Sequence, residues 1–170
     1  PDSVVYVGDS AFSYCGSLKN VVVPKKVTEI NFATFSQCTS LKSVKLGEGV
    51  KNIGGYAFAD CTALSLVTIH RNLEYIDYHA FENCYKLVEV VNNSDLNIVV
   101  GEDIVNGGIG KYALSVHGGE SEMDVVGDTY KFLTVDGKNY LVDAVDKEGA
   151  YNLPENYKGK PYAIRDYAFY

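Results

Sequence analysis

Residues 57–64 read Ala-Phe-Ala-Asp-Cys-Thr-Ala-Leu, and the skeleton of this phrase returns at a constant interval of 23 residues. In each copy Cys lies three positions after Phe, and Leu lies three positions after Cys. The four copies begin at Ala11, Thr34, Ala57 and Ala80. A fixed period in the low twenties is typical of a solenoid, in which each repeat is one supersecondary unit stacked on the next. A solenoid presents an extended surface, so the pattern indicates architecture more sharply than it indicates a ligand.

A short strand is predicted after each repeated Leu, because apolar residues alternate there with period two. In the second copy this segment is Leu41–Leu46. The fourth copy has Asn92 where an aliphatic residue is expected, and a buried amide without a partner costs about 1–3 kcal/mol. We therefore expect the fourth repeat to loosen at this point. The predicted inward-facing residues are Val21, Val44, Val67, Val90, Val23, Leu46 and Ile69.

The rest of each repeat predicts a second strand and a tight turn. A second apolar pair, such as Val50 and Ile53, predicts a short strand on the opposite side of the repeat. The Ala-Phe-x-x-Cys segment has apolar residues three positions apart, which favours one turn of α or 3₁₀ helix. Parallel strands on adjacent repeats lie about 4.8 Å apart, so each residue should stack on its counterpart one period later.

These residues resemble the BspA-type leucine-rich repeat. The likeness rests on the period, on Ile53-Gly54 before Ala57-Phe58, and on the spacing of Cys61 and Leu64; it covers residues 1–100. The resemblance implies a leucine-rich-repeat solenoid, mainly β, right-handed and curved, with a parallel sheet on its concave face. It also implies a bacterial surface protein, extracellular or cell-surface, in a family implicated in adhesion and in binding host proteins. No catalytic residue comes with it.

The period fails from Gly101 and returns near the end of the chain. Tyr130–Val135 and Lys138–Val142 alternate around Asp136-Gly137, the strongest short-range signal for a β-hairpin. Residues 164–169 resemble residues 53–58, and Lys111-Tyr112-Ala113-Leu114 is a weaker echo of the same phrase. We therefore predict a repeat array over 1–100, a degenerate or inserted segment with a β-hairpin over 101–147, and the start of a further repeat over 148–170. The inserted segment would seal the end of the first array.

Composition narrows the class of partner. The chain has 170 residues, a net charge of −7 and 15 scattered Lys and Arg residues, which argues against nucleic acid or an anionic membrane. No apolar run approaches the roughly 20 residues of a membrane span, so we expect no direct membrane insertion. The chain begins at Pro1 rather than Met, which favours a piece of a longer protein.

No residue pattern predicts a cofactor, a metal site or catalysis. The four Cys residues are spaced as a line along the solenoid, whereas a structural zinc site needs ligands that converge. Stacked Cα atoms are close enough for disulfides, but equivalent side chains point the same way; we expect four reduced, buried thiols. None of His70, His79 and His117 has a partner at metal or catalytic spacing, and His79 takes a position held by Ser10, Ala33 and Tyr56 in other copies. We interpret His79 as a tolerant surface residue.

Function is better sought at the outward strand positions, whose residue types do not repeat. Residues can also occupy such positions simply because they favour strands. The sequence is therefore compatible with two interpretations, a contact surface and strand propensity alone. Tyr6, Tyr75, Tyr78 and Tyr85 flank the strip. The candidate binding face consists of Asn20, Val22, Ser43, Lys45, Leu66, Thr68, Glu89 and Val91.

We expect a non-enzymatic recognition module, secreted or on the cell surface, that binds a protein ligand through this face. The 14 Tyr residues of a chain without Trp leave carbohydrate binding as one alternative, because Tyr suits wet binding surfaces. A spacer within a larger surface protein is the other.

Overall fold

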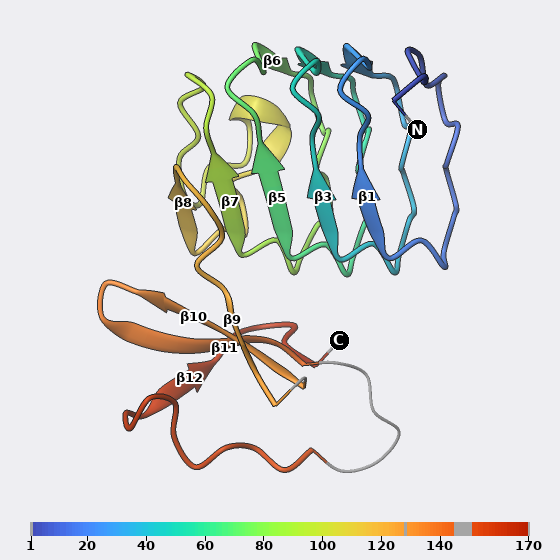
Figure 1. Ribbon diagram of the computed structural model, residues 1–170. Helices are drawn as coiled ribbons and strands as arrows, with labels where there is room; N and C mark the ends of the chain where they lie inside the picture. Colours follow the sequence, from blue (N-terminus) through green and yellow to red (C-terminus); the bar gives the residue numbers. More distant parts are fainter. Residues whose placement is uncertain (1, 128, 145–150, 170) are drawn as a thin grey trace. The chain divides into compact units, whose positions relative to one another are not determined.

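The computed structural model describes residues 2–127, 129–144 and 151–169. The chain divides into two compact units, the first ending at Ser121 and the second beginning at Glu122. The first unit is a mostly-β solenoid built from parallel strands, as predicted (Figure 1).

Each repeat of the first unit contributes a strand to a parallel sheet. The interval of 23 residues sets the register, since Val21 pairs with Val44 and Val44 with Val67. The five-stranded sheet has the order β1 (Asn20–Val22), β3 (Ser43–Lys45), β5 (Leu66–Ile69), β7 (Glu89–Asn92) and β8 (Ser115–His117). The second predicted strand of each repeat forms a separate parallel sheet of β2 (Glu29–Ile30), β4 (Asn52–Ile53) and β6 (Tyr75–Ile76).

The core of the first unit lies between these strands and the repeated turns. Val44, Val67 and Val90 are buried, as their inward positions predict. The repeated Phe side chains stack along the solenoid, with ring centroids 5.3 Å apart for Phe35 and Phe58 and nearly parallel planes. Since each ring packs on the ring of the next repeat, the repeated apolar columns account for the stability of the array.

The Ala-Phe-x-x-Cys segment is not the helical turn that its spacing predicts. The Cys61 N–H bonds to the Phe58 carbonyl within one repeat, whereas the Phe58 N–H bonds to the Ala80 carbonyl of the next. The backbone donors thus alternate between their own turn and the neighbouring repeat, which a helix does not allow. This path requires left-handed backbone at non-glycine residues, including Tyr56 with φ 57° and Asp60 with φ 57°.

The array continues past residue 100, where the sequence pattern fails. Strand β8 pairs in parallel with β7, and Ser115 lies opposite Glu89 at an interval of 26 residues. The 3₁₀ helix η1 (Val105–Gly108) lies in the segment between these strands. A side chain at Gly107 would meet the Asp77 carbonyl and the Ala80 side chain, so glycine is required at this approach.

Asn92 does not break the fourth repeat as expected. It pairs with Ile69 at the end of β7, and its Nδ2 donates to the Leu96 carbonyl at 2.8 Å. Its Oδ1 accepts from both the N–H and the hydroxyl of Ser94. The half-buried amide is therefore satisfied, and it turns the chain away from the strand.

The second unit contains the predicted hairpin. Strands β10 (Tyr130–Val135) and β11 (Lys138–Ala144) are antiparallel around Asp136 and Gly137, which both have positive φ. β9 (Asp124–Val126) pairs with β10, and β12 (Tyr162–Ile164) pairs in parallel with β11.

The C-terminal copy of the repeat phrase keeps the geometry of the first array. Leu141 lies opposite Ile164, again 23 residues apart. Tyr167 has φ 64°, like Tyr56 in the equivalent position. Strand β11 thus serves as the preceding repeat for β12. The predicted boundary between residues 147 and 148 lies outside the described residues.

Candidate functional site

Parallel pairing brings six of the predicted face residues together in two rows. Asn20, Ser43 and Leu66 occupy one row, and Val22, Lys45 and Thr68 occupy the next. All six side chains reach solvent, and Val22 is 73% exposed. We call these six residues the variable face.

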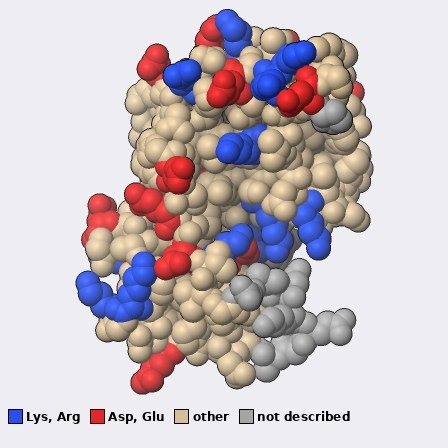
Figure 2. All heavy atoms as spheres, viewed as in Figure 1, with Lys and Arg blue, Asp and Glu red and all other residues tan. Residues whose placement is uncertain are grey.

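The variable face is mainly uncharged. The Ser43 hydroxyl donates to the Asn20 side-chain carbonyl at 2.8 Å, which links two strands on the surface. Lys45 is the charged residue among the six. Figure 2 shows this sheet as largely uncharged, with Lys and Arg interspersed among Asp and Glu at the edge where β6 lies. Such a surface, mixed in polarity, suits contact with a protein or a neutral ligand better than electrostatic capture of a highly charged one.

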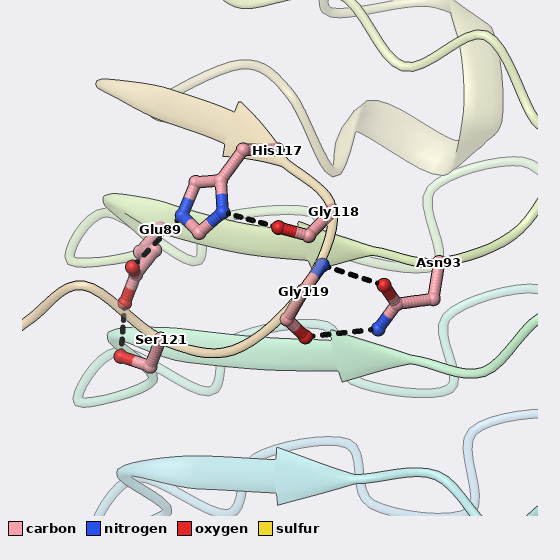
Figure 3. Close-up of polar contacts among 6 residues, drawn as sticks. All are labelled: Glu89, Asn93, His117, Gly118, Gly119 and Ser121. Atoms are coloured by element: carbon pink, nitrogen blue, oxygen red, sulfur yellow. Dashed lines mark hydrogen bonds and ion pairs between the residues drawn. The ribbon is translucent and has the colours of Figure 1, made fainter.

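The other two predicted face residues are not available on this surface. Glu89 and Val91 lie on β7, and both are buried. Figure 3 shows the chain turning after His117 and running back past β7 to Ser121. We call residues 118–121 the strap. Glu89 does pair with Leu66 of the neighbouring strand, as the period predicts, but the sequence pattern could not show that a later segment returns to this place.

Hydrogen bonds to two side chains of the fourth repeat hold this part of the chain against β7. His117 Nε2 lies 3.0 Å from Glu89 Oε1, and the Ser121 hydroxyl donates to Glu89 Oε2 at 2.5 Å. The Gly119 N–H donates to Asn93 Oδ1 at 2.7 Å, and Asn93 Nδ2 donates to the Gly119 carbonyl at 3.2 Å. Two side chains of the fourth repeat, Glu89 and Asn93, therefore fix the path of the strap.

The grouping of Glu89, His117 and Ser121 has the residue types of a hydrolase triad but not its connections. In a triad the serine hydroxyl bonds to histidine, which a carboxylate orients from its other side. Here the Ser121 hydroxyl and His117 Nε2 both bond to the same carboxylate. The arrangement stabilises a buried carboxylate.

The cysteines follow the predicted column with one exception. Cys38, Cys61 and Cys84 are buried, and all four thiols are free. The Cys61 thiol donates to the Phe35 carbonyl at 3.1 Å, and Cys84 repeats this bond to Phe58. Cys15 is exposed, which differs from the expectation, because it lies in the outermost repeat of the described array. Among the described residues no group of three or more His, Cys, Asp or Glu side chains is placed to hold a metal ion.

The residues that sequence reasoning missed come from the segment after residue 100. The weak echo at Lys111–Leu114 was the available signal, since it leads directly into β8 and the strap. Within the described ranges, no helix has the length and hydropathy needed to cross a membrane.

Comparison with known proteins agrees with the repeat geometry. No curated protein matches the chain. Among solved structures, a leucine rich cell surface protein from Faecalibacterium prausnitzii A2-165 is similar at 19% identity and a TM-score of 0.32. The match covers 74% of this chain and 45% of that protein, so this chain spans less than half of its length. Six copies of the BspA type leucine rich repeat match residues 1–104, and the chain belongs to this family.

Proposed function

We propose that this chain is a non-enzymatic recognition module of a cell-surface or secreted protein, and that it binds a protein partner through the variable face. The proposal rests on the difference between the repeated positions of the strands and the outward-facing ones. The columns that repeat, such as Val44, Val67 and Val90, are buried and build the fold. The columns that face outward differ in chemistry from repeat to repeat, and parallel register assembles them into one continuous surface.

Family membership supports the surface assignment, because the BspA-type resemblance implies bacterial surface proteins that bind host proteins. The sheet geometry supports a protein partner. Val22, Leu66 and the stem of Lys45 supply apolar area, while Asn20, Ser43 and Thr68 supply donors and acceptors among them. Interfaces of recognition proteins combine these two kinds of group in one patch.

The test is capture of extracellular-matrix and serum proteins on immobilised chain, followed by affinity measurement with the purified partner. The variant Leu66→Glu with Lys45→Glu should reduce affinity by at least about tenfold, since it places unpaired charge in the centre of the contact. A matched control is Val5→Glu with Lys26→Glu, which makes the same kinds of change at exposed residues away from this sheet. Equal binding by the two variants contradicts the assigned face, and the absence of any captured protein favours a spacer.

A further inference from the structure

A row of aromatic side chains crosses three repeats beside the three-stranded sheet. Tyr56 is at its centre, with its ring stacked on that of His79 at 5.3 Å between centroids and 11° between planes. Phe32 and Tyr78 pack edge-on against Tyr56 at 5.8 and 5.4 Å. Phe32 is 48% exposed and Tyr78 is 54% exposed. We call Phe32, Tyr56, Tyr78 and His79 the aromatic ledge.

The ledge runs directly into a polar pocket, because His79 belongs to both. The pocket is lined by Glu82 and Asn83 from the fourth repeat and by Asp103 and Lys111 from the segment around η1. Gly107 and Gly108 form part of its wall, so backbone rather than side chains bounds it there. The segment that breaks the 23-residue period therefore supplies half of the pocket.

The polar groups of the pocket are paired but remain accessible. Lys111 Nζ lies 3.0 Å from Asp103 Oδ2, and His79 Nδ1 lies 3.7 Å from Glu82 Oε2. The Lys111 and Asp103 side chains are 38% and 60% exposed. The hydrogen bond from Lys111 to Asp103 raises the pKa of the Lys111 amine above its ordinary value. Asn83 is held by its own bond to Asp60 and presents a fixed amide.

We propose that the ledge and the pocket together form a binding site for a neutral saccharide. A pyranose ring has an apolar face of C–H groups, which packs on aromatic rings, and a rim of hydroxyl groups, which each donate and accept hydrogen bonds. The ledge offers the rings. The carboxylates, amide and amine of the pocket offer acceptors and donors to the hydroxyl groups. One side chain, His79, joins the two parts, so a ligand of two or more sugar units contacts both.

The charges of the pocket favour a neutral sugar over an anionic one. Glu82 and Asp103 place two carboxylates in the pocket against the single amine of Lys111, which is already paired with Asp103. A sialylated or sulfated glycan would bring further negative charge beside Glu82, which is unfavourable. The site is separate in residues from the variable face, so it adds to the proposed function and does not depend on it.

The test is a titration of the whole chain with cellotetraose, chitotetraose, maltotetraose and sialyllactose, followed by NMR amide shifts and calorimetry. At least one neutral tetrasaccharide should bind, with shifts that centre on Tyr78, His79, Asp103 and Lys111. Tyr78→Ala removes an exposed ring, and Asp103→Asn changes charge while keeping shape; each should weaken binding by about tenfold. Circular dichroism and thermal melting show that both variants are folded.

Lys26→Glu, at an exposed residue outside both proposed sites, is the control and should leave saccharide affinity unchanged. No binding of any neutral probe up to about 10 mM overturns the proposal. Tighter binding of sialyllactose overturns the assigned charge class, and unchanged affinity in both variants overturns the assigned site. A chain that binds no protein but still binds a saccharide would contradict the proposed role of the variable face and leave this site standing. The two proposals can therefore fail separately.

Discussion

His117 Nε2 lies 3.0 Å from Oε1 of Glu89, a carboxylate with no exposed surface, although the two residues are 28 positions apart in the chain. Within the five-stranded sheet, Glu89 belongs to the last strand that keeps the 23-residue period, and His117 belongs to β8, which does not. The contact therefore joins the regular part of the array to its irregular end. A buried carboxylate is tolerated only where hydrogen bonds replace its hydration, which makes this contact sensitive to substitution.

We predict that His117→Ala loosens the strap. The substitution removes a partner of the buried Glu89 carboxylate, and the free energy of unfolding of the first unit should fall by about 1–3 kcal/mol. Hydrogen exchange at the Gly119 amide should become faster, since the strap is held by the contacts around His117. Denaturant unfolding and amide exchange measured by NMR check the two outcomes.

Asn93→Ala tests the strap independently of the buried charge. It removes both hydrogen bonds between the Asn93 side chain and Gly119 and should cost about 0.5–1.5 kcal/mol. Asn72→Ala is the matched control, because it also removes an exposed amide bond to a neighbouring carbonyl but lies away from the strap. If exchange at Gly119 is the same in all three variants, the strap is not held in the way described.

Glu89 also shows where sequence-based prediction ends. Its place in the column of Asn20, Ser43 and Leu66 follows from the period, and the pairing of Leu66 with Glu89 confirms that place. Its burial depends on His117 and Ser121, which come 28 and 32 residues later and follow no repeat. A repeat pattern predicts the structure of the residues that form it. The burial of a surface also depends on which other segment of the chain packs on it.

The repeated turns give a second example. The spacing of Ala57, Phe58 and Cys61 correctly predicted which side chains enter the core, since all three are buried. The backbone path is a series of turns and not the turn of α or 3₁₀ helix that the spacing predicts. Tyr56 has a positive φ although such backbone favours Gly, Asn and Asp, so its residue type carried no signal. Hydrogen bonds to the next repeat stabilise this path, and no single repeat contains that information.

We predict that native alkylation at neutral pH modifies Cys15 and spares the other three cysteines. Cys15 is exposed, whereas burial raises the pKa of the Cys38, Cys61 and Cys84 thiols. A thiol with a raised pKa forms little thiolate, which is the reactive species. Mass spectrometry should find one label on the folded chain and four after denaturation without reductant. If Cys61 is labelled as fast as Cys15, the buried cysteines are accessible to the alkylating reagent, which contradicts the prediction.

Gly49→Ala should destabilise the first unit by about 1–3 kcal/mol, because a side chain there meets backbone it cannot displace. A Cβ atom at Gly49 would contact the Lys25 carbonyl and lie 2.8 Å from the Val27 carbonyl. Gly16→Ala is the matched control, since its nearest neighbour would be Thr39 Oγ1 at 3.7 Å. Denaturant unfolding should show a loss for the first variant and little change for the second. If both substitutions change the free energy of unfolding equally, the close approach of neighbouring repeats at Gly49 does not exclude a side chain there.

Stability of the second unit should depend on the ionisation of Asp124. The Tyr157 hydroxyl donates to Asp124 Oδ2 at 2.9 Å, and Lys158 Nζ lies 3.2 Å from the same oxygen. These contacts, Tyr157 first, hold the pKa of Asp124 below its ordinary value. The ionised form is thus favoured by folding. Its contribution is complete above the ordinary pKa of Asp and is lost as the pH falls through the lowered value.

Tyr157→Phe is the sharpest test of this dependence, because it removes the hydroxyl and keeps the ring that stacks on Phe132 at 4.3 Å. The pKa of Asp124, followed by the NMR shift of its carboxyl carbon, should rise toward the ordinary value. The acid-side loss of stability should begin at a correspondingly higher pH. Lys158→Gln removes the cation that also lowers the pKa of Asp124 and should likewise raise it. An Asp124 pKa that is the same in both variants as in the unaltered chain would contradict this account.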